Sequence, residues 1–450
     1  MRLRASNFSW SFFLFGFGSQ LQLFGSSLSF TELFVVIAGP VILLRELPYM
    51  KKTGAHKFFG MAVLTVVGCV VSCLFNQTPF SHALRGLATT VILAFSIAVG
   101  HWLLRRDMNG YKWLFLGIAL SGVVSTFYFQ KSVEINQLAH GAIGKDAVEA
   151  IMEGPIYWIG RIRPFLMAIP NGWYLQCPWA LCVMLPIGFS LFAMLTTVSG
   201  RSAALTSLAA VVLMLWGGKR RATMRRIGKY FWVIVTVGIL GLFVAKNIYS
   251  IAAKNDLLGE KARLKYEAQT QGDSGMLRLL LGGRMESFCG LIACIDRPLV
   301  GFGPWAVDEK GYVSEFISKY GTYEDVEQQI KSETELRHRG VYARMIPCHA
   351  YITEFWLWYG LAGLLFWLYV IYVFSRFLRQ DCWVIPQWYL WIACGIPGFL
   401  WGVFFSPLGE RAVTMLFVTT CFIARGVRLG KIQMPPSMIG EIIQCERRGK

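Results

Sequence analysis

Charged residues are scarce in this sequence, and acidic residues are the scarcest of them. Only 16% of the 450 residues are charged, and 26 Asp and Glu stand against 44 Lys and Arg. Hydrophobic residues make up 55% of the chain, and the mean hydropathy is +0.49. This balance excludes a soluble globular domain, because such a domain needs a more polar surface. Apolar runs of roughly 18 residues or more recur along the chain and are long enough to cross a bilayer.

Residue patterns for metal and nucleotide sites are also lacking. The eleven cysteines lie mostly within apolar segments, without the paired spacing of a metal site. The Asp, Glu and His residues form no cluster with ligand spacing, so we expect neither a metal nor another cofactor. The segment 301–305 (GFGPW) resembles part of a phosphate-binding loop but lacks the Lys and Ser/Thr of that motif, and it predicts a tight turn. A disulfide is left open among the cysteines of one polar loop: Cys289, Cys294 and Cys348.

The net charge of +18 comes mainly from short basic segments and the C-terminal tail. The basic segments between apolar runs are 50–57, 105–106, 217–229 and 375–381. Lys and Arg collect on the cytoplasmic side of membrane proteins, so this distribution predicts membrane topology and not a nucleic-acid-binding surface. The first apolar run lacks a small-residue cleavage site, so we expect a retained span and not a removed signal peptide.

We therefore predict an all-α polytopic membrane protein with about 12 transmembrane helices. Ten spans are expected at 8–25, 29–46, 58–76, 84–104, 111–129, 201–216, 230–248, 350–374, 383–404 and 409–424. The apolar stretch 164–197 is interrupted by Pro170, Pro178 and Pro186. We expect two short or broken helices there, with a tilted single helix and a re-entrant piece as the alternative.

Domain boundaries follow from the same count. Residues 1–200 hold the first helices and a smaller outer loop at about 130–170, and residues 201–248 hold further helices. A large outer loop covers 249–349, the last helices cover 350–424, and a basic cytoplasmic tail covers 425–450. Helices are expected within the large loop at 249–270, 284–295 and 323–338.

His349 is the first candidate for chemistry. It lies where the outer loop meets the apolar run 351–374, at the water-facing end of a predicted helix. An imidazole there can exchange protons with a substrate held at the membrane surface. The alternative is a histidine that only anchors the interface. Glu354 follows in the first turn of the helix, where an inward-facing carboxylate would orient or charge the imidazole.

Arginines supply the candidate anion-binding groups. Arg201 stands at the outer end of the segment 202–216, where the positive-inside rule disfavours a cation. We therefore favour a role in binding an anion over that of a snorkelling membrane anchor. Arg284 follows two glycines at the start of a predicted loop helix, a position that suits phosphate; the alternative is a solvated arginine. Three further arginines either complete a cationic site or form a solvated face: Arg337, Arg339 and Arg344.

Three blocks of residues occur in an order that resembles one known family. The first is residues 199–205 (SGRSAAL), and the second is 283–286 (GRME) followed by 296–303 (DRPLVGFG). The third is His349-Ala350, nine residues, and then 360–363 (GLAG). Together these blocks, over about 195–375, resemble the signature of the O-antigen ligase/polymerase family. Ala350 departs from the family pattern, in which Asn, Ser or Gln usually follows the histidine.

The resemblance implies metal-independent transfer of a glycan from an undecaprenyl-pyrophosphate carrier, at the periplasmic face of the bacterial inner membrane. It also implies one large periplasmic loop between late helices. His349 would act as general base for an acceptor hydroxyl, while Arg201 and Arg284 would stabilise the departing pyrophosphate. A single displacement of this kind would invert the anomeric centre. The expected partners are the lipid-linked glycan donor, a lipid A-core or carrier-linked glycan acceptor, and membrane lipids, with no nucleic acid.

Two alternatives stay open. A ligase that modifies lipid A-core and a polymerase that joins repeat units share this chemistry, and the motifs around the donor do not separate them. A secondary transporter of an anionic solute or lipid-linked sugar would also use interfacial arginines. A transporter predicts inverted repeats with paired broken helices, whereas this sequence shows one proline-rich broken region, at about 164–197.

Overall fold

The structure is a computed structural model. It describes residues 8–19, 21, 28–122, 124, 251, 255, 285–315, 345–346, 348, 350–382, 384–385, 388–405 and 411–433. The labelled helices in this part are α1 (Ser9–Ser19), α2 (Phe30–Thr53), α3 (Ala55–Phe75), α4 (Phe80–Arg106), α15 (Met285–Asp296), α18 (Tyr351–Tyr359), α19 (Leu361–Gln380), α20 (Tyr389–Phe405) and α21 (Arg411–Arg428). Residues 111–122, in the span predicted at 111–129, are also helical. Regular structure in these residues is helical, and Val307 and Met345 form an isolated β-bridge.

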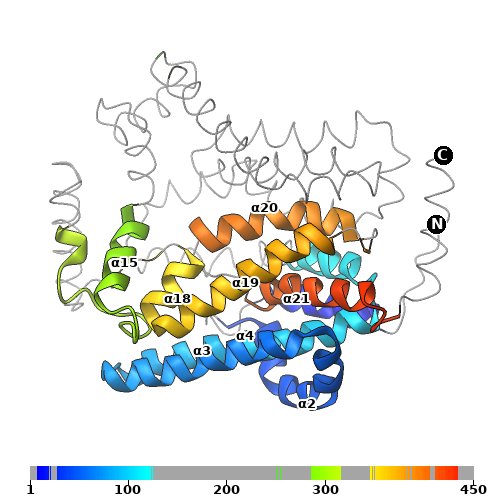
Figure 1. Ribbon diagram of the computed structural model, residues 1–450, viewed down its shortest axis with the longest axis horizontal. Helices are drawn as coiled ribbons and strands as arrows, with labels where there is room; N and C mark the ends of the chain where they lie inside the picture. Colours follow the sequence, from blue (N-terminus) through cyan, green and yellow to red (C-terminus); the bar gives the residue numbers. More distant parts are fainter. Residues whose placement is uncertain are drawn as a thin grey trace.

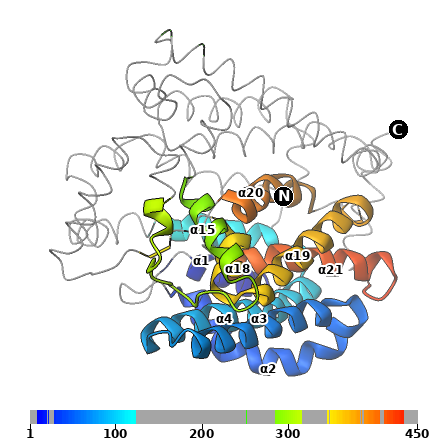
Figure 2. The ribbon, with the colours of Figure 1, turned by 60° about the vertical axis from the view of Figure 1, so that its left-hand side comes forward.

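Among the described helices, α2, α3, α4 and α19 are long and apolar enough to cross a membrane. This finding agrees with the predicted class of an all-helical, multi-pass membrane protein. The central helix is α4, since 72% of its most apolar window is buried, against 28% for α2 and for α3. It packs against α2, α3 and α21 (Figures 1 and 2). The spans predicted between 125 and 250, and most of the large outer loop, lie outside the described residues.

Helices continue further than predicted where basic residues follow an apolar run. α2 extends through half of the predicted connector 50–57 to Thr53, and Gly54 alone (φ +87°) separates it from α3. α21 continues to Arg428, past the predicted end of its apolar run at 424. The negative end of the helix dipole stabilises Lys and Arg in the last turn, so these residues lengthen a helix instead of ending it.

One predicted span is divided in two. The run 350–374 forms α18, of 9 residues, and α19, of 20 residues, with Gly360 between them (φ +60°, ψ −144°). A helix of 9 residues is too short to cross a bilayer, so the prediction of one continuous span from 350 is wrong. Hydropathy did not reveal the break, because it reports burial in an apolar phase and not backbone conformation. Within the first predicted run, 8–25, the described residues include the helix α1, and residues 20 and 22–25 lie outside the described part.

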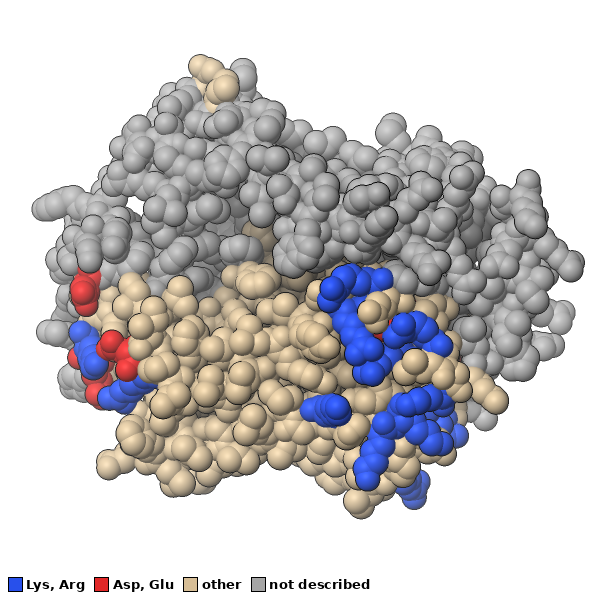
Figure 3. Space-filling model, viewed as in Figure 1, with Lys and Arg blue, Asp and Glu red and all other residues tan. Residues whose placement is uncertain are grey.

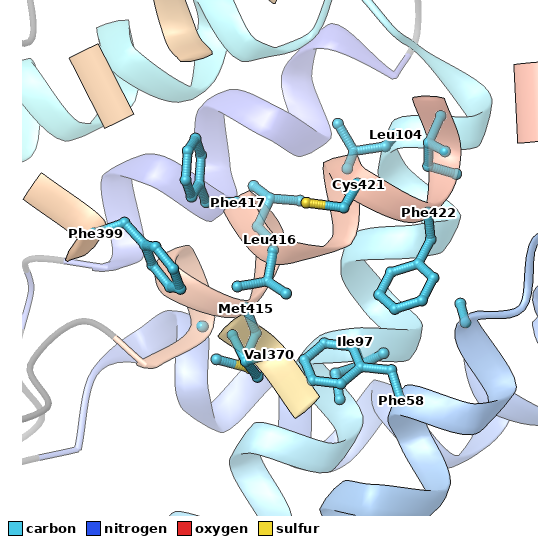
Figure 4. Close-up of a cluster of buried hydrophobic side chains, with 14 of the residues drawn as sticks. Phe58, Ile97, Leu104, Val370, Phe399, Met415, Leu416, Phe417, Cys421 and Phe422 are labelled. Atoms are coloured by element: carbon cyan, nitrogen blue, oxygen red, sulfur yellow. The ribbon is translucent and has the colours of Figure 1, made fainter. Parts of the chain in front are cut away.

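Aromatic side chains link the early and late helices in one core (Figure 4). Phe58 of α3 stacks on Phe422 of α21, with ring centroids 5.4 Å apart, and on Phe366 of α19 at 5.5 Å. Phe399 of α20 and Phe417 of α21 lie 5.8 Å apart. Each such pair contributes about 0.5–1.5 kcal/mol beyond apolar burial. The N-terminal and C-terminal helices therefore form one packed unit.

A buried polar network fixes α2 against α4. Glu46, whose side chain is 1% exposed, accepts hydrogen bonds from Arg105 Nε (2.6 Å) and Arg105 Nη2 (2.9 Å). It also pairs with His101 Nδ1 at 2.8 Å, and His101 Nε2 lies 3.0 Å from Thr53 Oγ1. The Arg105 guanidinium lies over the Tyr49 ring, 3.7 Å from its centroid. A buried carboxylate requires such partners because its desolvation is costly.

Charge distinguishes the two ends of the bundle. On the face shown in Figure 3, Lys and Arg gather at one end, and both signs of charge meet at the other. The first, which we call the basic end, holds the carboxyl-terminal ends of α2, α4, α19 and α21, where Arg428 Nε pairs with Asp381 Oδ1 (2.5 Å) and Gly54 lies against Arg425. The second, which we call the mixed-charge end, includes Asp296 and Lys310. This arrangement agrees with the prediction that the basic connectors 50–57, 105–106 and 375–381 share one side, while the connector 217–229 lies outside the described residues.

Candidate functional site

The loop 297–303 docks onto the break between α18 and α19, at the mixed-charge end. Two loop N–H groups donate to the last carbonyls of α18: Phe302 N to Leu357 O (2.7 Å) and Gly303 N to Trp358 O (3.2 Å). Leu361 N, at the start of α19, donates to Leu299 O (3.0 Å). Helix ends leave such groups without intrahelical partners, and here the loop supplies them. We call this contact the Gly301–Gly360 junction.

Two glycines make the junction possible. Gly301 has φ +74°, and a Cβ there would lie 2.6 Å from Leu357 O and 2.7 Å from Gly360 N. Gly360 has φ +60°, and a Cβ there would overlap the Leu299 carbonyl. Both the left-handed backbone and the close approach therefore require residues without a side chain. Two of the three blocks in the family resemblance meet at this point.

The same loop is tied to the corner between α3 and α4. Asn76 Nδ2 donates to Gly301 O (3.1 Å), and Asn76 Oδ1 accepts from Arg297 Nη1 (2.6 Å). Pro304 packs directly against Gly86 of α4. The loop is thus held between the α3–α4 corner and the α18–α19 break, so its position depends on both halves of the bundle.

Aromatic residues cover the junction. The segment 301–305, predicted to be a tight turn, has irregular structure at 301–303 and a turn at 304–305, and Trp305 has a φ of +54°, which is rare for a residue with a side chain. The Trp305 ring lies 4.6 Å from that of Trp358 on α18 and 6.2 Å from that of His82 on α4. Trp356 Nε1 donates to Pro298 O (3.0 Å). These contacts offset the backbone strain, which costs about 1–3 kcal/mol.

The helix predicted at 284–295 is confirmed as α15, and the acid at its end anchors the following segment. Asp296 Oδ2 accepts hydrogen bonds from Lys310 Nζ (2.8 Å) and from the Tyr312 hydroxyl (2.5 Å). These two donors, Lys310 first, lower the pKa of Asp296. Burial, together with the Asp296 carboxylate, raises the pKa of Tyr312. Asp296 is therefore an ionised anchor for the chain that follows the junction.

Glu354 lies in the first turn of α18 and is 8% exposed, so this side chain is buried. Burial raises the pKa of the Cys348 thiol, and the charges of Cys294 and Glu354 add to the effect. Cys294 Sγ donates to Thr353 O (3.6 Å), which joins α15 to the same turn of α18. The three cysteines of this loop are free thiols. A carboxylate is thus held on the inner side of the helix that follows His349.

Most predicted site residues lie outside the described part of the chain: His349, Arg201, Arg284, Arg337, Arg339 and Arg344. Their roles therefore stay predictions, as does the effect of Glu354 on the imidazole. The chain next to two of them is described, because Ala350 is the N-cap of α18 and Met285 begins α15. α15 packs against α18 (Figure 2), so the helices that follow Arg284 and His349 lie side by side.

Sequence reasoning missed an ion pair at the amino-terminal ends of α2 and α21. Arg411 Nη1 donates to Glu32 Oε1 (3.2 Å), while Glu32 Oε2 accepts from the Ser29 N–H (3.0 Å). Arg411 Nε is buried and has no hydrogen-bond partner in the part of the chain that the structure describes. An arginine that begins an apolar run was the signal that could have found it, as for Arg201.

Among the described residues, no group of three or more His, Cys, Asp or Glu side chains is placed to hold a metal ion. Comparison with protein-family models, curated proteins and solved structures gave no match to this chain. The mixed-charge end offers a docked loop, a short helix with a buried carboxylate, and a set of aromatic side chains.

Proposed function

We propose that this protein is a membrane glycan transferase of the O-antigen ligase or polymerase type. It would move a glycan from an undecaprenyl-pyrophosphate carrier to an acceptor hydroxyl. The observation that carries the proposal is the Gly301–Gly360 junction. Two blocks that resemble the family's signature are about 60 residues apart in the sequence, yet their glycines interlock through backbone contacts. Such mutual dependence is expected of segments that build one site.

The location of the junction suits a lipid-linked donor. It lies at the end opposite the basic end, and positive-inside orientation directs the basic end to the cytoplasm. The junction then faces the periplasm of a bacterial inner membrane. α18 begins two residues after His349, which brings the candidate base to the same region. The donor phosphates and the acceptor would meet at this membrane surface, so binding supplies proximity and orientation.

The proposed chemistry needs three kinds of group. His349, as neutral imidazole, takes the proton of the acceptor hydroxyl while its oxygen attacks the anomeric carbon, and a general base contributes about 10²–10⁴-fold. Arg201 and Arg284 bind the pyrophosphate that leaves, because guanidinium groups pair with phosphate bidentately and stay charged. The carboxylate of Glu354 stabilises the positive charge of the His349 imidazolium that forms in this step. The displacement inverts the anomeric centre, and no metal is required.

A transporter is the alternative, and the break at Gly360 argues against it. Broken helices of transporters use free backbone groups to hold solute. Here two N–H groups of the loop 297–303 donate to the carbonyls at the end of α18, and the Leu299 carbonyl of the loop accepts from the first N–H of α19. This break is therefore filled by the protein's own chain.

The test is transfer by purified protein in detergent, with an undecaprenyl-pyrophosphate glycan as donor. One reaction contains lipid A-core as acceptor, and the other contains a carrier-linked single repeat unit. Product on lipid A-core alone identifies a ligase, and a ladder of products on the carrier identifies a polymerase. If neither acceptor is used while proteoliposomes accumulate an anionic solute, the transferase proposal is wrong.

A further inference from the structure

A group of arginines at the basic end carries more positive charge than its neighbours balance. We call Arg376, Arg425 and Arg428, with Asp381 and Gln380, the Arg425 cluster. Gln380 Oε1 accepts from both Arg376 Nε and Arg428 Nη2, each at 3.3 Å. Arg428 Nε pairs with Asp381 Oδ1 at 2.5 Å, and this aspartate is 2% exposed. Within the described residues, three cations thus face one carboxylate, which leaves two positive charges of this cluster unbalanced there.

Among the described residues, Arg425 is the member of the cluster without an ion-pair partner. It makes no ion pair with any carboxylate in the described residues, and its Nε is buried there without a hydrogen-bond acceptor. A buried N–H that lacks an acceptor is unfavourable and calls for an explanation, such as a bound group. Arg425 Nη1 lies 3.2 Å from the position that a Cβ of Gly54 would take. Gly54 begins α3 without a side-chain cap, so Arg425 adjoins the positive end of that helix.

An apolar surface leads from the cluster along α19. Leu365, Leu368, Tyr372 and Arg376 are spaced three or four residues apart and therefore share one face of the helix. The first three are exposed, by 39%, 45% and 55%. α19 is a candidate membrane span, so this face suits acyl chains, and its cationic end lies where phospholipid headgroups lie.

We propose that the Arg425 cluster binds the phosphate of an anionic phospholipid, whose acyl chains lie along the exposed face of α19. Guanidinium groups pair with phosphate bidentately, and Arg425 makes no ion pair with a carboxylate of the described residues. Asp381 holds Arg428 in place from the side away from the lipid. This site lies at the opposite end of the bundle from the Gly301–Gly360 junction and does not depend on the proposed transferase activity.

The test is thermal unfolding of purified protein in detergent, titrated separately with phosphatidylglycerol, phosphatidylcholine and inorganic phosphate. A ligand that binds only the folded state raises the unfolding temperature. We expect a rise with phosphatidylglycerol that exceeds the rise with phosphatidylcholine. Arg425→Gln should weaken the apparent affinity for phosphatidylglycerol by about tenfold or more. Arg45→Gln is the matched control, because Arg45 is exposed on α2 and its loss removes the same charge.

A second variant keeps the test decisive if the first variant does not fold. If Arg425→Gln does not fold, Arg376→Gln removes a half-buried member of the cluster and should give the same loss. Equal affinity in the wild type and in both cluster variants would overturn the proposal. So would an equal rise with phosphatidylcholine, or no rise with any lipid. If inorganic phosphate alone raised the unfolding temperature as much as phosphatidylglycerol does, the cluster would be a site for free anions, and the assignment to a lipid would be overturned.

Discussion

Gly301 and Gly360 approach so closely that neither position has room for a side chain. A Cβ on Gly301 would lie 2.7 Å from Gly360 N, and a Cβ on Gly360 would overlap the Leu299 carbonyl. Both residues have positive φ. This pair joins the loop 297–303 to the break between α18 and α19, and the other contacts of the candidate site surround it.

Gly360→Ala should undock the loop. The substitution strains a backbone with φ +60° and creates an overlap with Leu299, so we expect a loss of about 2 kcal/mol or more in unfolding free energy. Thermal unfolding in detergent measures it. Gly60→Ala is the matched control, because a Cβ on Gly60 in α3 meets nothing within 4 Å, and this variant should unfold at or slightly above the wild-type temperature. Equal unfolding temperatures for the two variants would contradict the role of the junction.

Glu46→Gln should destabilise the packing of α2 on α4. The change removes the charge that Arg105 and His101 share, and breaking a buried pair typically costs about 3 kcal/mol or more. Lys310→Gln breaks the pair with Asp296, where both side chains are well exposed, and should change the unfolding temperature little. If the two variants unfold at the same temperature, the network does not stabilise the bundle.

The anchor at Asp296 should depend on pH. Its pKa is lower in the folded protein than in the unfolded chain, mainly through Lys310 and then Tyr312. The stabilisation is therefore complete above the unfolded pKa, about 3.9 for Asp, and is lost as the pH falls through the lower folded value. The unfolding temperature of the wild type minus that of Asp296→Asn should be largest near neutral pH and shrink on acidification. A difference that grows on acidification would contradict this sign.

Arg284→Lys should lose most of the transfer activity although it keeps the charge. A lysine offers a point charge in place of the planar fork that pairs two phosphate oxygens, and loss of one stabilising donor typically costs about 10²–10³ in rate. Release of undecaprenyl pyrophosphate from the donor measures it. Arg106→Lys, an exposed arginine at the basic end, should release the carrier at the wild-type rate. Equal rates for the two variants would argue against a bidentate phosphate contact.

The helices could largely be predicted from the sequence. Hydropathy found the cores of α2, α3, α4, α20 and α21, because each is a long apolar run. Their ends were less accurate, since Lys51 and Lys52 lie within the last turn of α2 and not in a loop. The break at Gly360 was not predicted, although its glycine was singled out, because an apolar run has the same composition whether or not it is broken.

The contacts around the site could be predicted only in part. Within the segment predicted to turn, 301–305, residues 304–305 form a turn, and Glu354 lies buried in the first turn of α18. Asn76 could not have been found, because it joins Gly301 and Arg297 across more than 200 residues of sequence, and no local pattern marks that contact. The pair of Arg411 with Glu32 spans 379 residues. The position of Arg411 at the start of an apolar run marked that arginine, but no local pattern marked Glu32 as its partner.

The most direct test of the transferase account is donor turnover by His349→Ala beside His56→Ala. Both variants remove one imidazole, but His56 lies at the start of α3, at the basic end. The account predicts that His56→Ala releases undecaprenyl pyrophosphate at the wild-type rate. It predicts that His349→Ala is slower by about 10²–10⁴-fold while its unfolding temperature is unchanged. Near-wild-type turnover by His349→Ala would mean that this histidine is not the base and that the proposed mechanism is wrong.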